Sequence, residues 1–95
     1  MSDLFAPGQT RITPEFLKNQ IKTDGVKYNR LGSTLTHCTI TVKNGFTFTG
    51  ESACVDPANY NKEIGEQIAF DNAFDEMWGP YGFALSQHLH ELNSK

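Results

Sequence analysis

Residues 35–50 alternate between apolar and polar side chains, the two-residue period of a half-buried β-strand. The apolar positions are Cys38, Ile40 and Val42 in a first run and Phe46 and Phe48 in a second. Lys43-Asn44-Gly45, a sequence typical of turns, stands between the two runs. The pattern therefore predicts a β-hairpin.

The loop length of this hairpin decides which side chains share a face. A two-residue Asn-Gly turn would scatter the apolar side chains over both faces of the hairpin. A three-residue loop with Gly45 in the left-handed conformation places Ile40 opposite Phe48 and Val42 opposite Phe46. All five apolar side chains then lie on one face. Since each buried apolar side chain contributes about 1.5–3 kcal/mol, we expect the three-residue loop.

A long helix is predicted after the hairpin. Asp56-Pro57 is typical of a helix start, with a capping carboxylate before a first-position proline, and Gly79-Pro80 is expected to end the helix near Trp78. The expected apolar face consists of Tyr60, Ile64, Ile68, Phe70, Phe74, Met77 and Trp78. On its flank lie three small residues, which would allow close approach to a sheet or a partner helix: Gly65, Ala69 and Ala73.

The two ends of the chain are less regular. Residues 1–10 are expected to form a flexible arm, and residues 11–95 a single domain. Thr13-Pro14-Glu15 indicates the start of a short helix that Asp24-Gly25 should end. Residues 26–34 fit a loop or a short edge strand. A short last helix is expected, with an apolar face of Phe83, Leu85, Leu89 and Leu92.

Together these elements predict an α+β fold: a β-hairpin or small antiparallel sheet packed on one long helix, with short N- and C-terminal helices. A two-stranded hairpin is too small a sheet to be stable alone. Either a third strand forms near residues 26–31, or two copies of the chain join their sheet edges. A homodimer is therefore our hypothesis for the second case.

Composition and charge narrow the classes of partner. The 95 residues suffice for one domain. The 8 Lys+Arg and 11 Asp+Glu give a net charge of −3, so nucleic acid is not an expected partner. No apolar run approaches the roughly 18 residues that would span a bilayer. Two cysteines make no disulfide framework, which favours a cytosolic protein. Residues 1–50 carry 6 − 3 = +3 and residues 51–95 carry 2 − 8 = −6, which permits association with a second copy or a basic partner.

Two aspartates are candidates for chemistry within the apolar arc of the long helix. Asp71 and Asp75 lie four positions apart and could bind a ligand or act as a general acid/base pair. Alternatively, they bond to the hairpin backbone or lie partly exposed at the helix edge. Because like charges at this spacing repel, at least one should have a cationic partner among Lys27, Arg30 and Lys43.

The connection between hairpin and helix holds a second group of candidates. Cys54 could act as a nucleophile, with Ser52 and Asp56 nearby and a helix start downstream, but no histidine is close in sequence. A tight structural connection is the simpler interpretation. The candidate binding residues here are Glu51, Ser52, Cys54, Asp56 and Asn59. A helix start is also an anion site, although the charge of Asp56 counts against an anionic ligand.

Other chemistry has no motif in this sequence. His37, His88, His90 and the cysteines lack the paired spacing of zinc ligands, so no metal is expected. There is no glycine-rich phosphate loop and no nucleophile elbow, so we assign no catalytic residue and expect neither enzymatic activity nor a cofactor.

One stretch of sequence resembles a known family. The run from Asn44 to Tyr60, with Thr-Gly-Glu-Ser-Ala-Cys-Val-Asp-Pro at its centre, continues through Glu63-Ile64-Gly65 to Tyr81-Gly82-Phe83. Between Thr39 and about Leu85 the chain is similar to a family of small tailed-phage proteins of unknown function, found in N-four-like podophages and temperate enteric phages.

The resemblance implies a phage origin and expression in the bacterial host cytoplasm, and no catalytic residue. By analogy with other small phage proteins, we expect a non-enzymatic accessory protein that binds and modulates a host or anti-phage-defence component. The alternative is an oligomeric protein that sequesters a small anionic ligand, such as a nucleotide signal.

Overall fold

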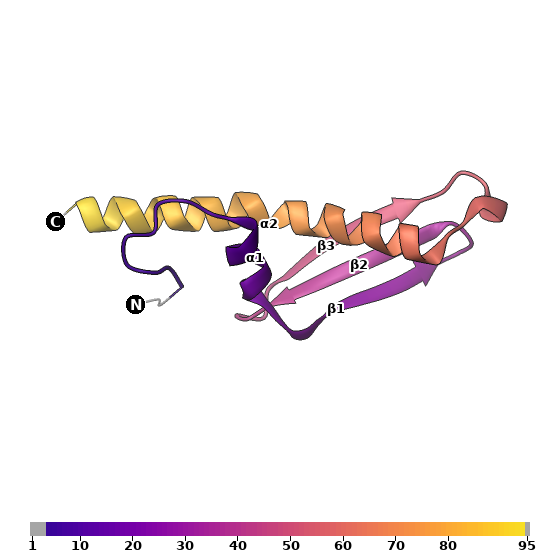
Figure 1. Ribbon diagram of the computed structural model, residues 1–95, viewed down its shortest axis with the longest axis horizontal. Coiled ribbons are helices and arrows are strands. Elements are labelled where there is room, and N and C mark those ends of the chain that lie inside the picture. The colour runs from indigo at the N-terminus through magenta and orange to yellow at the C-terminus, as the bar shows by residue number, and fades with distance from the viewer. Residues whose placement is uncertain (1–3, 95) are drawn as a thin grey trace.

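The computed structural model describes residues 4–94 and has two layers (Figure 1). A three-stranded antiparallel sheet in the order β1-β2-β3 forms one layer, and a long helix, α2, crosses one face of it. The elements are α1 (Pro14–Gln20), β1 (Ile21–Leu31), β2 (Leu35–Val42), β3 (Thr47–Ala53), the 3-10 turn η1 (Pro57–Asn59) and α2 (Lys62–Asn93). The predicted α+β class is confirmed.

The β2–β3 hairpin has the predicted register. Ile40 lies opposite Phe48, and the Val42 N–H donates to the Phe46 carbonyl at 3.0 Å. Gly45 has a φ of 93°, the left-handed conformation that the three-residue loop requires. The side chains of Cys38, Ile40, Val42 and Phe48 are buried. Phe46 is the exception: its ring packs edge-on against Phe48 but stays 60% exposed.

The third strand exists, and it begins earlier than expected. β1 pairs with β2 from Leu31 back to Val26, and after an irregularity again at Ile21. The predicted helix end at Asp24-Gly25 is wrong, because α1 stops at Gln20. Asp24, with a φ of 60°, instead lies in the irregular segment within β1. The Gln20 carbonyl accepts from the Lys43 N–H at 2.9 Å, which ties the chain to the hairpin where the strand begins.

α2 is one helix of 32 residues, so the two separate helices predicted here are wrong. Asp56-Pro57 starts only η1, and α2 begins after Asn61, whose side chain accepts from the Ile64 N–H at 3.0 Å. The helix continues through Gly79-Pro80. A proline ring clashes with the Cβ of the residue before it when that residue is helical. Gly79 has no Cβ, which lowers the cost of helical backbone at this step.

The buried face of α2 shares only Met77 with the predicted one. Its buried residues, mostly small and spaced four apart, are Ala69, Ala73, Met77, Tyr81 and Leu85. Ile64, Ile68 and Trp78, predicted to face the sheet, are 58%, 45% and 36% exposed. The flank of small residues is therefore the face that meets the sheet, because it lets the helix backbone approach β3 closely.

The N-terminal segment packs on the half of α2 that extends beyond the sheet (Figure 1). Leu17 is fully buried, and the Phe16 ring meets Tyr81 edge-on at 5.9 Å. The Phe5 ring stacks on Phe16 at 5.6 Å and lies 5.5 Å from the His88 ring. Of the expected arm, residues 1–3 lie outside the described residues, whereas residues 4–10 include this aromatic contact.

Candidate functional site

The candidate residues of the β3–α2 connection do not form one site. Along β3 the side chains alternate, so Ser52 is half-buried on the side of α2, while Glu51 is exposed on the open face of the sheet. The Asp56 side chain accepts from the Ala58 N–H at 3.0 Å and caps η1. Cys54 is half-buried, and its N–H donates to the Thr34 carbonyl. Asn59 is exposed in η1.

Asp71 and Asp75 lie apart from that connection, on the face of α2 turned away from the sheet. Asp71 follows the buried Ala69 by two positions, and Asp75 follows the buried Ala73 by two. Two positions correspond to about 200° around a helix, so each aspartate lies nearly opposite its alanine. Asp71 accepts from the Gln67 side chain at 2.9 Å. The expected ion pair with Lys27, Arg30 or Lys43 is wrong, because within residues 4–94 no cation lies within 4.0 Å of either carboxylate. The apolar neighbours of the two aspartates on this face, Ile64, Ile68 and Trp78, are exposed rather than packed on the sheet.

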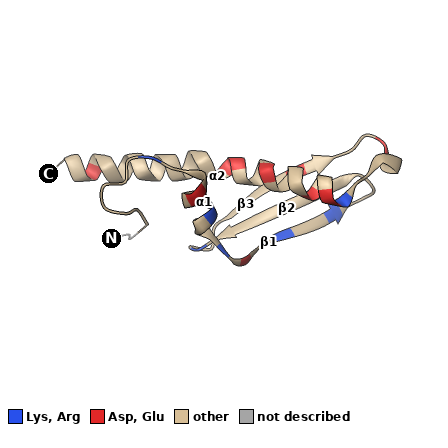
Figure 2. Cartoon of the chain, viewed as in Figure 1, with Lys and Arg blue, Asp and Glu red and all other residues tan. Residues whose placement is uncertain are grey.

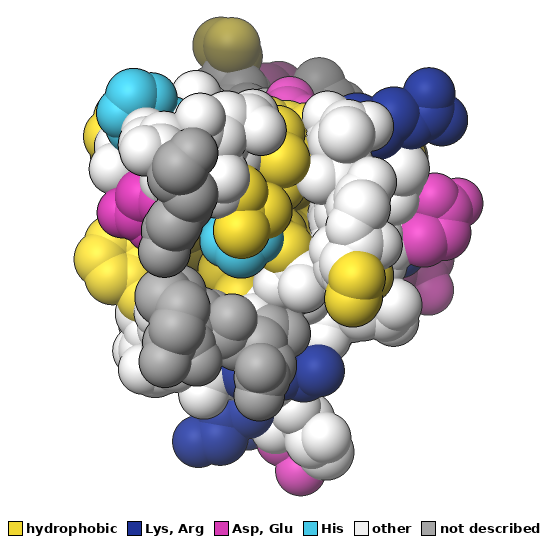
Figure 3. Space-filling view, turned by 90° about the vertical axis from the view of Figure 1, so that its left-hand side faces the viewer, with side chains coloured by type: hydrophobic (Ala, Val, Ile, Leu, Met, Phe, Trp, Pro, Cys, Tyr) yellow, Lys and Arg dark blue, Asp and Glu magenta, His cyan; other side chains and the backbone are white. Residues whose placement is uncertain are grey.

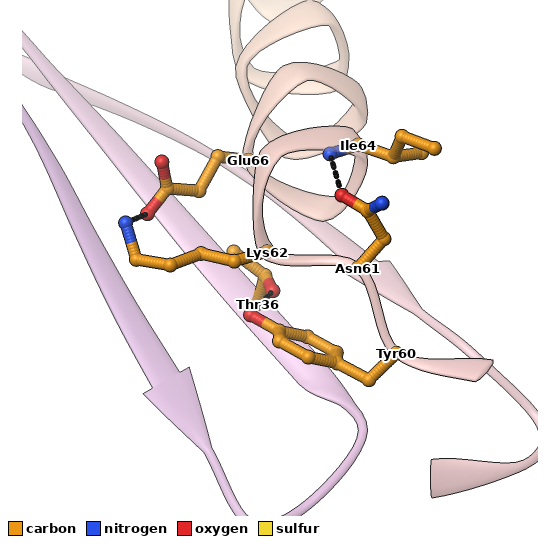
Figure 4. A network of polar contacts seen from close by, with 6 residues as sticks. All are labelled: Thr36, Tyr60, Asn61, Lys62, Ile64 and Glu66. Carbon is orange, nitrogen blue, oxygen red and sulfur yellow. Dashed lines mark hydrogen bonds and ion pairs between the residues drawn. The ribbon is translucent and has the colours of Figure 1, made fainter. Parts of the chain in front are cut away.

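Polar contacts gather around the start of α2, and those of Tyr60 join it to the sheet (Figure 4). The Thr36 and Tyr60 hydroxyls share a hydrogen bond of 3.2 Å, and the Arg30 guanidinium lies 3.7 Å from the centroid of the Tyr60 ring. Lys62 and Glu66 form a salt bridge of 3.1 Å. A small cavity of ≈ 270 Å³ lies here, lined by Tyr28, Asn29, Arg30, Thr36, Tyr60, Lys62 and Glu66.

A larger groove of ≈ 570 Å³ lies at the opposite end of the sheet, under the middle of α2. Its walls are mainly apolar and come from the hairpin loop, α2 and the N-terminal segment: Leu4, Gln20, Val42, Lys43, Asn44, Phe46, Phe48, Pro80, Tyr81 and Ala84. Figure 3 views the molecule from the end where both termini lie and shows hydrophobic side chains gathered at its centre. None of the seven predicted site residues lines either cavity.

Burial alters the acidity of three groups in the core and at its edge. It raises the pKa of the Cys38 thiol, and the nearby charge of Glu66 raises it further. It also raises the pKa of the Tyr28 and Tyr81 hydroxyls. These groups therefore stay protonated at neutral pH, and Cys38 acts as a small apolar side chain.

Two kinds of feature are absent from residues 4–94. No cluster of three or more His, Cys, Asp or Glu side chains is arranged to hold a metal ion in this part of the chain. In the same region, no helix has both the length and the apolar character to cross a membrane.

The outward face of α2 holds two of the predicted site residues, Asp71 and Asp75, beside three apolar residues whose exposure was not predicted. Five residues there form what we call the outer stripe: Ile64, Ile68, Asp71, Asp75 and Trp78. All five are exposed, including three large apolar side chains. Their spacing of 4, 3, 4 and 3 was visible in the sequence. The direction in which they point depends on the small residues of the opposite face, which pack against the sheet.

Comparisons with known proteins place this fold in a phage family. Residues 12–89 match a family model described as the phage protein (N4 Gp49/phage Sf6 gene 66) family. The match is wider than the stretch that carries the resemblance in the sequence, because it also includes α1 and β1. No curated protein and no solved structure matches the chain. Since the family model covers well over half of its length, the chain belongs to the phage protein (N4 Gp49/phage Sf6 gene 66) family.

Proposed function

We propose that this phage-family protein is a non-enzymatic accessory protein that binds and modulates a host or anti-phage-defence protein in the bacterial cytoplasm. The observation that carries the proposal is the exposure of Ile64, Ile68 and Trp78 on the outer stripe. Large apolar side chains that share one exposed face are typical of protein–protein interaction surfaces. Tryptophan in particular is enriched among residues that dominate binding energy.

A photo-crosslinking amino acid at position 68 tests this proposal in bacterial cells. We expect one discrete adduct, of reproducible mass, between the phage protein and a host protein. The matched control carries the same amino acid at Thr49, which is exposed on the open face of the sheet, and should give no such adduct. Absence of an adduct at position 68, or the same adducts at both positions, would contradict the proposal.

The alternative function, sequestration of a small anionic ligand such as a nucleotide signal, is favoured by the smaller cavity. Arg30, Lys62 and two tyrosines line that cavity beside the start of α2. Glu66 also lines it and pairs with Lys62, which weakens attraction for an anion. Thermal unfolding with linear and cyclic nucleotides tests this function, because a ligand that binds the folded state raises the Tm. An unchanged Tm at millimolar nucleotide would count against it.

The homodimer stays a prediction with a weaker basis. It was expected in case the hairpin lacked a third strand, and β1 supplies that strand. The outer edges of β1 and β3 still offer backbone groups for pairing with a second copy. Light scattering across a concentration series measures this directly, and a constant monomer mass at high micromolar concentration would exclude the homodimer.

A further inference from the structure

The outer stripe has the spacing of a coiled-coil seam. Its residues recur at intervals of 4, 3, 4 and 3, the repeat that keeps one line of side chains facing a partner helix. The same spacing continues through Gly82, Leu85, Leu89 and Leu92. Leu85, however, is only 4% exposed. The accessible seam is therefore the outer stripe itself, about 21 Å or four helical turns of α2.

The charges of the seam are confined to its middle. Asp71 and Asp75 separate the two isoleucines from Trp78, and among residues 4–94 no cation lies within 4.0 Å of them. The surrounding half of α2, residues 62–77, carries one lysine and five acidic residues, a sum of 1 − 5 = −4. Figure 2 shows this concentration of acidic residues along the part of α2 that lies over the sheet.

From this spacing and charge, we propose that the outer stripe docks an amphipathic helix of the partner protein, with apolar side chains at heptad positions and two basic side chains opposite Asp71 and Asp75. The proposal rests on the protein-binding function above and names its site and the chemistry of its partner. Apolar contacts at both ends would supply burial, and the central charge pairs would fix register and partner choice.

A second copy of α2 is a poor occupant of this seam. The outer stripe and its continuation to Leu92 contain no lysine or arginine, so no register of self-pairing brings a cation to the aspartates. In a parallel pairing, the aspartates of one copy would face those of the other. Like charges in a seam select against that pairing. The partner must therefore supply the basic residues.

The test uses two synthetic 21-residue helical peptides with leucines at the heptad positions. One carries lysine at two adjacent central seam positions, and the other carries glutamate there. We expect the lysine peptide to bind the full chain at least about tenfold more tightly than the glutamate peptide. The double substitution Asp71→Lys with Asp75→Lys should reverse this preference. Both aspartates are exposed, so this variant should fold, which circular dichroism checks.

A matched control separates a specific seam from general attraction to negative charge. The substitutions Glu63→Lys and Glu76→Lys change the net charge by the same amount as the two aspartate substitutions. They do so at exposed positions of α2 outside the outer stripe. The lysine peptide should remain the preferred ligand of this control variant. Failure of both peptides to bind, equal binding of the two, or a preference reversed by the control as well would overturn the inference. If position 68 still crosslinks to a host protein in that case, the proposed function stands and only the helical partner is wrong.

Discussion

Gly50 of β3 lies directly against the backbone of Ala73 in α2. A Cβ atom at position 50 would overlap the Ala73 nitrogen and would lie 2.6 Å from the Ala69 carbonyl oxygen. The absence of a side chain on Gly50 therefore sets the distance between the two layers. It also explains why alanines, rather than the larger apolar residues of α2, face the sheet.

Replacing Gly50 by alanine should destabilise the fold by about 3 kcal/mol or more, because backbone atoms cannot swing aside as a side chain can. Urea unfolding followed by circular dichroism measures the loss. Gly82→Ala is the control, since a Cβ there meets nothing within 4 Å. In the interior of α2 it should add roughly 1 kcal/mol of stability. A Gly50→Ala variant as stable as the native chain would refute the close approach of α2 to β3.

The two candidate caps of the long helix can be separated by substitution. Asn61 caps α2, whereas Asp56 caps only the three-residue turn η1. Asn61→Ala should lower the free energy of unfolding by about 1 kcal/mol, the usual value of an N-cap. Asp56→Ala should lower the free energy of unfolding by clearly less than Asn61→Ala does. Thermal unfolding of both variants checks the order, and a larger loss from Asp56→Ala would show that the helix begins at the Asp-Pro junction instead.

Pro80 should reduce the stability of α2 without interrupting it. A proline inside a helix lacks the N–H that would donate to the carbonyl four residues earlier, here that of Glu76. Pro80→Ala should therefore raise the free energy of unfolding by about 1–3 kcal/mol and leave the helix content unchanged. Circular dichroism gives both quantities. A large gain in helix content would mean that the native chain breaks at this position.

Stability should fall in alkaline solution. The ordinary pKa values are 9.0 for the Cys38 thiol and 10.0 for the Tyr81 hydroxyl, and burial raises both in the folded state. The protonated forms are thus favoured by folding, so the contribution of these two groups to stability is constant below about pH 9. The stabilisation from each group begins to decline when the pH passes the pKa of that group in the unfolded chain. The decline ends when the pH passes the higher pKa of the same group in the folded chain.

Urea unfolding between pH 7 and pH 10.5 measures this decline. Cys38→Ala should raise the pH at which stability begins to fall, toward the ordinary tyrosine pKa of 10.0. A free energy of unfolding that stays constant across this range would contradict the assigned effect of burial.

The hairpin was predictable from sequence because its information is local. One turn and two alternating runs are enough to decide between registers that bury or expose two phenylalanines. The buried face of α2 was not, because it depends on which residue of the sheet lies opposite. Isoleucine and tryptophan outweigh alanine in any count of apolar residues, yet only small residues fit against Gly50.

In the candidate site, too, local features were predictable from the sequence and features that depend on tertiary packing were not. Asp56 was correctly identified as a cap, but of a short turn, because the helix start depends on Asn61 as well. The cation–π contact between Arg30 and Tyr60 joins residues thirty positions apart, and no periodicity reveals it. The spacing of the outer stripe was present in the sequence, but its exposure follows only from the packing of the opposite face.

The part of α2 beyond Pro80 gives the molecule extents of 59 × 22 × 17 Å, with the helix along the longest axis (Figure 1). Such a body rotates faster about its long axis than end over end. Amide vectors in α2 lie nearly parallel to that axis, whereas those of the strands take other angles. Nitrogen-15 relaxation in solution should therefore differ systematically between α2 and the sheet, and capture of a large ligand on either end would slow the end-over-end rotation most.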